Sequence, residues 1–259
     1  MKKFLVLMLL ILKITGCSSG PSDALVVGME LAYPPFETKD NSGNPMGVSV
    51  ELAKAFGEYL GKEVIIENIN WTGLIPALQT DKVDLVISSM TITEVRKESV
   101  DFSDGYAKAY LAFLVNKDSP VTVSADLNNT NRTIAVKTGS TGDFYVTNNY
   151  PNAKVLRLDD ESAAIAEVIN GRADAFIYDQ LTIVRNFQQY QEKTKTVFIE
   201  NQQPEYWGAA FKKGSPLVEQ FNAFLKTFKE EKGFEPIVEQ YLKEEKELFD
   251  DLGFAFFFD

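Results

Sequence analysis

The sequence predicts an α/β protein with two lobes, and two observations support this prediction. Short apolar runs typical of buried strands alternate with helical patterns from residue 25 to residue 199, as in βαβ units with parallel sheets and helices on both faces. The pattern also repeats, because residues 82–87 (KVDLVI) have a counterpart in residues 172–177 (RADAFI), and each stretch ends a β-α-β-α-β run. Two similar lobes are therefore expected rather than one sheet.

The individual elements follow from the spacing of apolar residues and from the residues that end each run. For example, Leu52, Phe56 and Leu60 recur at helical spacing, and Gly61 follows them as a C-cap. In the first half we expect strands at 25–29, 64–66, 83–87 and 100–102, and helices at 52–60, 74–79 and 93–98. After residues 110–115 the pattern restarts with strands at 133–136, 155–156, 173–177 and 197–199, and helices at 141–149, 162–170 and 181–191. Two helices, 216–232 and 236–247, end the chain.

The lobes are expected to be joined by two short crossing strands, because no low-complexity linker separates them. The predicted joins are residues 107–110 and 204–209. Lobe 1 then comprises residues 24–106 and 210–259, since the C-terminal helices are expected to return to it. Lobe 2 comprises residues 111–203.

The N-terminal segment is predicted to direct export. Two lysines precede an unbroken apolar run at residues 4–12, which is far shorter than the ~20 residues that a membrane span needs. Cys17 follows Gly16 at the place where bacterial lipoproteins carry their lipidated residue, so residues 1–16 are interpreted as a lipoprotein signal peptide and 17–23 as a tether. The alternative is a plain secretory signal with an incidental cysteine. The expected location is the periplasm or the outer face of the cell membrane.

Composition excludes several classes of function. The chain of 259 residues carries a net charge of −11, which argues against a nucleic-acid partner. It contains no histidine, so histidine-based catalytic triads and histidine metal sites are excluded. Its one cysteine permits neither an intrachain disulfide nor a cysteine-rich metal site. No cofactor or metal is expected, and a monomer is the expected form.

Polar and aromatic side chains gather where the predicted strands end. Ligands of open α/β sheets bind at the carboxyl ends of the strands, and two lobes with facing edges form a cleft. The first half places a cation, several hydroxyls and two aromatic rings there, and the second half adds an anion. The residues concerned are Glu30, Tyr33, Trp71, Ser88, Ser89, Thr91, Arg96, Lys137, Thr141, Tyr178 and Asp179.

Several motifs in this order resemble one family across essentially the whole mature chain. These motifs are residues 33–37 (YPPFE), 71–79 (WTGLIPALQ), 84–104 with SSMTITEVR and VDFSD, 137–141 (KTGST) and 172–179 (RADAFIYD). The chain resembles the bacterial extracellular solute-binding proteins of family 3, periplasmic proteins that supply polar amino acids to ABC importers. The resemblance implies the periplasmic-binding-protein fold, hinge closure on the ligand and an ABC transporter permease as partner.

The resemblance also assigns roles to the residues at the strand ends. Arg96 would hold the α-carboxylate of the ligand, helped by Thr91 and Thr141, because a guanidinium matches a carboxylate bidentately. Asp179 would accept from the α-ammonium group with help from Ser89. Tyr33 and Trp71 would sandwich the ligand side chain, with Ser88 nearby.

The residues alone also permit structural roles. Arg96 can pair with Glu94 or Glu98 on a solvated helix face, and Asp179 can cap its helix. The two aromatic residues can be part of the core, and the Ser88 and Thr91 hydroxyls can form turns.

Ligand preference is expected to depend on Glu30, Lys137 and Tyr178, which should face the ligand side chain. Glu30 accepts hydrogen bonds and Lys137 donates them, so an amide side chain satisfies both. Glutamine is therefore the first choice, and a basic amino acid is the second if Lys137 turns outward.

Two other functions remain open from the sequence. Cyclohexadienyl dehydratases resemble this chain in fold and export, and Glu30 is the candidate for the acid that they need. A lipoprotein that senses an amino acid without delivering it is the other possibility. The chain is expected not to be an enzyme, since the cleft residues account for an amino acid as a bound ligand.

Overall fold

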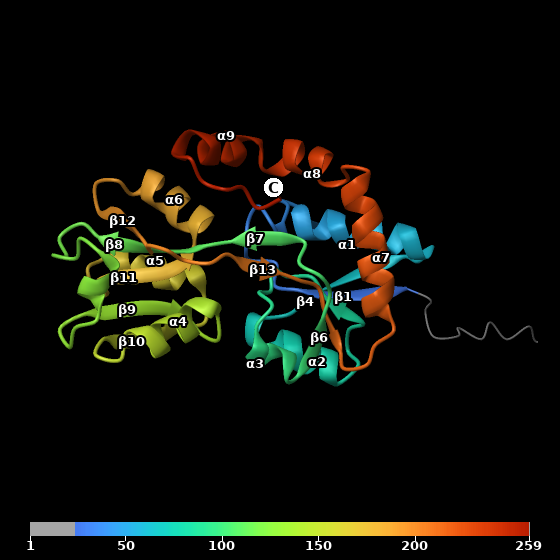
Figure 1. The fold of residues 1–259 in the computed structure, drawn as a ribbon, viewed down its shortest axis with the longest axis horizontal. Helices are drawn as coiled ribbons and strands as arrows, with labels where there is room; N and C mark the ends of the chain where they lie inside the picture. Colours follow the sequence, from blue (N-terminus) through green and yellow to red (C-terminus); the bar gives the residue numbers. More distant parts are fainter. Residues whose placement is uncertain (1–23, 259) are drawn as a thin grey trace, which may run out of the picture.

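The computed structural model describes residues 24–258, so the predicted signal peptide (1–16) and the whole predicted tether (17–23), with Cys17, lie outside the described residues. The chain forms two α/β lobes with a crossing region between them (Figure 1). Each lobe contains one five-stranded sheet covered by helices. Within residues 24–258, none of the helices has the length and apolar character needed to cross a membrane.

The sheet of lobe 1 has the order β4-β1-β5-β14-β6. Strands β4 and β5 both run parallel to β1, whereas β14 is antiparallel to β5 and to β6. Its strands are β1 (Leu25–Met29), β4 (Val64–Asn68), β5 (Leu85–Val86), β6 (Val100–Phe102) and β14 (Ala210–Lys212). Its helices are α1 (Val48–Leu60), α2 (Leu74–Gln79), α3 (Glu94–Lys97), α7 (Leu217–Glu230) and α8 (Phe234–Tyr241). The 3-10 turn η1 (Trp71–Gly73) precedes α2.

The sheet of lobe 2 has the order β10-β9-β11-β8-β12. Strands β10 and β11 are parallel to β9, and β8 is antiparallel to both β11 and β12. Its strands are β8 (Leu111–Asn116), β9 (Thr133–Lys137), β10 (Lys154–Leu158), β11 (Ala175–Asp179) and β12 (Thr194–Phe198). Its helices are α4 (Thr141–Asn149), α5 (Glu161–Ile169) and α6 (Gln180–Gln189), with the 3-10 turn η2 (Ser124–Leu127) before β9.

Two short antiparallel strands, β7 (Ala107–Ala109) and β13 (Glu205–Trp207), pair with each other between the lobes. The chain enters lobe 2 through β7 and leaves it through β13. Helices α7 and α8 pack beside α1 on lobe 1. The last helix, α9 (Lys243–Leu252), also reaches lobe 2, because Glu245 lies 3.9 Å from Arg185 of α6.

The structure corrects three expectations. The sheets are mixed rather than wholly parallel, because the strands that lead into and out of each lobe run against their neighbours. The expected strand at 83–87 has only two residues in regular pairing, Leu85–Val86. The expected helix at 236–247 is two helices, because Leu242 adopts φ −135 between α8 and α9. A small hairpin of β2 (Thr38–Lys39) and β3 (Pro45–Met46) was not foreseen.

Candidate functional site

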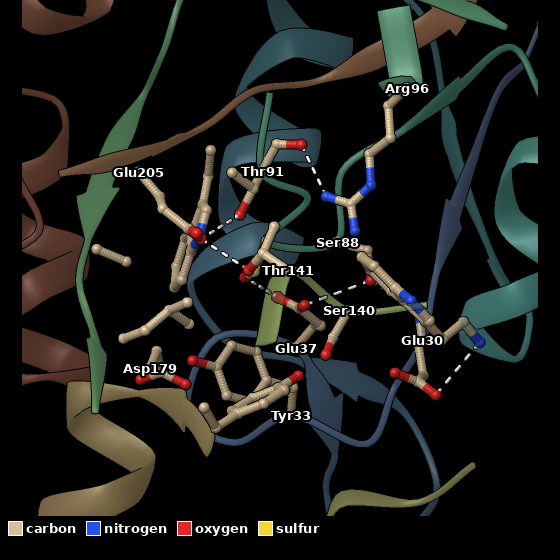
Figure 2. Close-up of a pocket in the computed structure, with 16 residues that line it drawn as sticks. Glu30, Tyr33, Glu37, Ser88, Thr91, Arg96, Ser140, Thr141, Asp179 and Glu205 are labelled. Carbon is tan, nitrogen blue, oxygen red and sulfur yellow. Dashed lines mark hydrogen bonds between the residues drawn. The ribbon is translucent and has the colours of Figure 1, made fainter. Parts of the chain in front are cut away.

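The carboxyl ends of the central strands of both lobes meet at one pocket with an empty volume of ≈ 510 Å³ (Figure 2). Ten of the eleven predicted site residues line it, and Lys137 does not. The lining residues are Glu30, Tyr33, Glu37, Trp71, Ser88, Ser89, Thr91, Arg96, Ala109, Leu111, Ser140, Thr141, Tyr178, Asp179, Glu205 and Trp207.

Arg96 is directed into the pocket from the short helix α3, which Thr93 caps by accepting from the Arg96 backbone N–H at 3.2 Å. Its guanidinium donates to the Thr91 carbonyl at 2.7 Å and to the Gly139 carbonyl of lobe 2 at 3.1 Å. Arg96 is buried, and burial lowers its pKa from 12.5 to about 10. The alternative of a solvated pair with Glu94 is wrong for Arg96, since Glu94 pairs with Lys97 instead.

Asp179 caps a helix, as its structural alternative predicts, and still offers an acceptor to the pocket. One carboxylate oxygen, Oδ1, caps helix α6 by accepting from the Thr182 backbone N–H at 3.1 Å. The other, Oδ2, is buried and has no hydrogen-bond partner among the described residues, and the same holds for the Tyr33 hydroxyl. Burial raises the pKa of Asp179 above its ordinary value, and the Thr182 N–H opposes this effect, as does the Tyr33 hydroxyl, which lies near the carboxylate without meeting the geometry of a hydrogen bond. A buried acceptor without a donor is costly, so a ligand that donates there would be stabilised.

Tyr33 forms part of the pocket wall and of the aromatic core behind it. Its ring stacks on Phe36 at 5.1 Å and meets Trp207 edge-on at 6.1 Å. Tyr178 of lobe 2 also meets it edge-on, at 5.7 Å. Both the core interpretation and the pocket interpretation of Tyr33 therefore describe the structure.

Two cations lie close to the ring of Trp71. The Arg96 guanidinium carbon is 5.1 Å from the centre of the indole ring, and the Lys137 Nζ is 5.7 Å from it. Lys137 is buried and forms an ion pair with Glu30 across the two lobes. This pairing explains why Lys137 does not line the pocket, and the expectation that it faces a ligand freely stays untested. Glu30 does line the pocket and also accepts from the Trp71 backbone N–H at 3.2 Å.

Glu37 lines the pocket and is the most deeply buried of its acids. It accepts from the hydroxyls of Ser49 at 2.6 Å, Ser89 at 3.0 Å and Ser88 at 3.3 Å. Burial is the main cause that raises its pKa from 4.5 to about 8. Ser89 adopts a left-handed conformation with φ 48, which is uncommon outside glycine and is found at functional sites. Sequence reasoning placed Glu37 in a motif but gave it no role.

Glu205 was not foreseen at all, although it lines the pocket. It comes from the crossing strand β13, and its Oε2 accepts from the hydroxyls of Thr91 at 3.2 Å and Thr141 at 2.7 Å (Figure 2). Burial, opposed by those hydrogen bonds and by Arg96, raises its pKa. A sequence signal existed, since an isolated acid sits in the predicted join at 204–209, but nothing indicated the direction of its side chain.

Metal binding has no support within residues 24–258, where no group of three or more His, Cys, Asp or Glu side chains is arranged to hold an ion. The site instead combines a buried cation, an unpaired carboxylate oxygen, hydroxyls and aromatic walls. Such a site suits a small zwitterion.

Comparison with known proteins identifies the family. The profile of the bacterial extracellular solute-binding proteins, family 3, matches residues 25–244. The arginine-binding extracellular protein ArtP of Bacillus subtilis is 31% identical over 258 residues, covering 95% of this chain and 100% of its own. The glutamine-binding ABC transporter protein GlnH of the same species is 31% identical over 235 residues, covering 86% and 83%.

A solved structure supports the same assignment. The crystal structure of an ancestral amino acid-binding protein, described as a precursor of cyclohexadienyl dehydratase, is 36% identical and has a TM-score of 0.76. It covers 85% of this chain and 95% of its own. With this fold, this cleft and a profile match over 25–244, the chain belongs to the bacterial extracellular solute-binding proteins of family 3.

Proposed function

We propose that the protein captures a polar L-amino acid between its lobes by hinge closure and delivers it to an ABC transporter permease. The observation that carries this proposal is the buried, unpartnered Asp179 Oδ2 of lobe 2 in the same pocket as Arg96 of lobe 1. A zwitterion offers an ammonium to the first and a carboxylate to the second. A ligand that touches both lobes favours the closed arrangement through these differential contacts.

The remaining roles follow from position in the pocket. Thr91 and Thr141 lie at the end where the α-carboxylate would meet Arg96, and Ser89, which also lines the pocket, is the proposed second acceptor for the ammonium. Strands β7 and β13 are the proposed hinge, because they are the two strands that connect the lobes directly. The lobes would then be residues 24–106 with 210–259, and residues 111–203.

Glutamine is the ligand that we expect to bind most tightly. Glu30 lines the pocket as an acceptor, and the proposal requires Lys137, which is buried in an ion pair with Glu30 near Trp71, to act as a donor when the ligand binds; an amide side chain would complement both. A basic side chain suits Glu30 but meets the charge of Lys137, and like charges in a closed cleft cost several kcal/mol. Basic amino acids are therefore the second choice. The relatives named for arginine and for glutamine show that both ligand types occur among similar proteins.

The protein is proposed to work outside the cytoplasmic membrane, held there by lipid on Cys17. Genes for a permease and an ATPase next to the gene for this protein would support delivery to a transporter over sensing. No nucleic acid is needed in this account, and a monomer is sufficient because both halves of the cleft come from one chain.

A thermal-shift panel of the twenty amino acids tests the proposal. Glutamine should raise the melting temperature most, and competition binding should then rank it against arginine, lysine and histidine. If any of these three binds at least about tenfold tighter than glutamine, the expected preference for an amide side chain is wrong. Turnover assays with prephenate and arogenate test the dehydratase alternative, which the similarity to a dehydratase precursor makes worth including. Product formation with either compound would contradict a purely binding role.

A further inference from the structure

One internal carboxylate occupies the end of the cleft where the proposed function needs a ligand carboxylate. Glu205 Oε2 accepts from the Thr141 hydroxyl of lobe 2 at 2.7 Å and from the Thr91 hydroxyl of lobe 1 at 3.2 Å. A single oxygen on the crossing strand therefore joins both lobes. Figure 2 shows these two hydrogen bonds side by side, with the Arg96 side chain entering the same pocket.

The charges around Glu205 make two carboxylates at this end incompatible. The two threonine hydroxyls hydrogen-bond to Glu205, and the charges that act on it include the Arg96 guanidinium from α3 and the Asp179 carboxylate at the end of β11. Arg96 is the single cation among them, and it is already hydrogen-bonded to two carbonyl oxygens. A ligand carboxylate that approaches Arg96 would meet the Glu205 charge in a poorly solvated site, where like charges repel strongly.

We propose that Glu205 is an internal substitute for the ligand: its carboxylate engages Thr91 and Thr141 in the unliganded protein, holds the lobes together and has to be displaced when the α-carboxylate of an amino acid binds. The inference rests on the proposed function, because it assumes an amino-acid carboxylate at Arg96. The displacement lowers the apparent affinity, since part of the binding free energy replaces contacts that already exist. Glu205 is therefore a gating residue on the hinge rather than a ligand-binding residue.

The opposite role for Glu205 makes an opposite prediction. Together with Asp179, its carboxylate has the charge to hold the α-ammonium of the ligand. If Glu205 holds the ammonium, removal of its carboxylate weakens amino-acid binding. If Glu205 competes with the ligand carboxylate, its removal strengthens binding.

The test uses Glu205→Gln and Glu205→Ala, with Glu200→Gln as the matched control. Glu200 lies five positions earlier in the chain and is exposed, and its replacement changes the net charge by the same amount. Titration calorimetry with glutamine and with arginine should show at least about fivefold tighter binding to both Glu205 variants, and wild-type affinity for Glu200→Gln. Unchanged or weaker binding to Glu205→Gln would overturn the proposal, and weaker binding would assign Glu205 to the ammonium.

A second measurement tests the contact between the lobes. Small-angle X-ray scattering of unliganded Glu205→Gln should give a larger radius of gyration than the unliganded wild type, and the two should coincide when saturated with ligand. An unliganded variant as compact as the wild type would contradict the role of Glu205 in holding the lobes together. If the proposed function itself is wrong, the wild type binds no amino acid in these titrations. This result is distinct from unchanged or weaker binding to the Glu205 variants.

Discussion

Glu30 of lobe 1 and Lys137 of lobe 2 form an ion pair across the cleft, in which the Lys137 side chain is only 3% exposed. Lys137 also lies over the ring of Trp71, so the pair is held against an aromatic wall. Because each charge neutralises the other, we expect the pair to favour a neutral polar side chain over a charged one.

Removal of this cation should change the ligand preference. Lys137→Met leaves the Glu30 carboxylate without its partner, and a basic ligand side chain can then take the place of the ammonium. The ratio of arginine affinity to glutamine affinity should rise at least about tenfold in competition binding. Lys154→Met, an exposed position on the neighbouring strand β10, should leave the ratio unchanged. An unaltered ratio in Lys137→Met would show that the pair does not set the preference.

Arg96 and Asp179 are expected to hold the two charges of the ligand. Arg96→Ala and Asp179→Asn should each weaken amino-acid binding by about 2–5 kcal/mol, because each leaves a buried ligand charge unpaired. Calorimetry measures this loss, and circular dichroism shows whether the variants fold. Arg172→Ala removes an exposed arginine that pairs with Glu167 and should bind normally. Near-normal affinity in either cleft variant would refute that variant's assignment.

Trp71 should report ligand binding by its fluorescence. Both tryptophans line the pocket, but Trp207 is buried and packs against Tyr33 and Phe36, whereas Trp71 is partly exposed. Ligand addition should change the intrinsic emission, and Trp71→Phe should remove a large share of the change. If the variant keeps the full signal, the change comes from Trp207 and Trp71 does not contact the ligand.

Glu37 should make stability depend on pH. Its pKa is raised from 4.5 to about 8 in the folded protein, so the folded state binds more protons than the unfolded state between these values. The free energy of unfolding therefore falls as pH rises through this window, by at most about 1.4 kcal/mol for each pH step of one. Burial also raises the pKa of the Glu161 carboxyl to about 8, so Glu161 likewise makes the free energy of unfolding fall as pH rises.

Urea denaturation of Glu37→Gln across this window measures the contribution. The slope of stability against pH should be smaller than in the wild type but not zero, because Glu161 remains. Glu200→Gln, at an exposed position, should keep the wild-type slope. A wild-type slope in Glu37→Gln would mean that Glu37 stays ionised in the folded protein.

Anchoring is expected to depend on the single cysteine. Cys17→Ser removes the thiol that is expected to carry the lipid, so the protein should move from the membrane fraction to the soluble exported fraction. Fractionation followed by immunoblotting shows the distribution. A variant that remains membrane-bound to the same extent would exclude the lipoprotein interpretation of residues 1–17.

The sequence was sufficient to locate residues whose place depends on local structure. Arg96 follows a capped turn, and Asp179 ends a strand at a helix N-terminus, so the strand pattern alone brings both to the cleft edge. Lys137 and Glu205 show the limit of this reasoning. Glu30, the partner of Lys137, lies 107 positions away, and the partners of Glu205 lie 64 and 114 positions away. These groups come within reach of one another only when the two lobes are assembled. The break at Leu242 depends on a single backbone angle, which apolar spacing does not reveal.

Titration of the wild-type protein with L-glutamine tests the central claim most directly. The account predicts saturable binding of one molecule per chain, abolished or strongly weakened in Arg96→Ala and Asp179→Asn. D-glutamine should bind far more weakly, because its α-groups cannot meet Arg96 and Asp179 together while its side chain reaches Trp71. No binding of glutamine, arginine, lysine or histidine to the wild type would contradict the account.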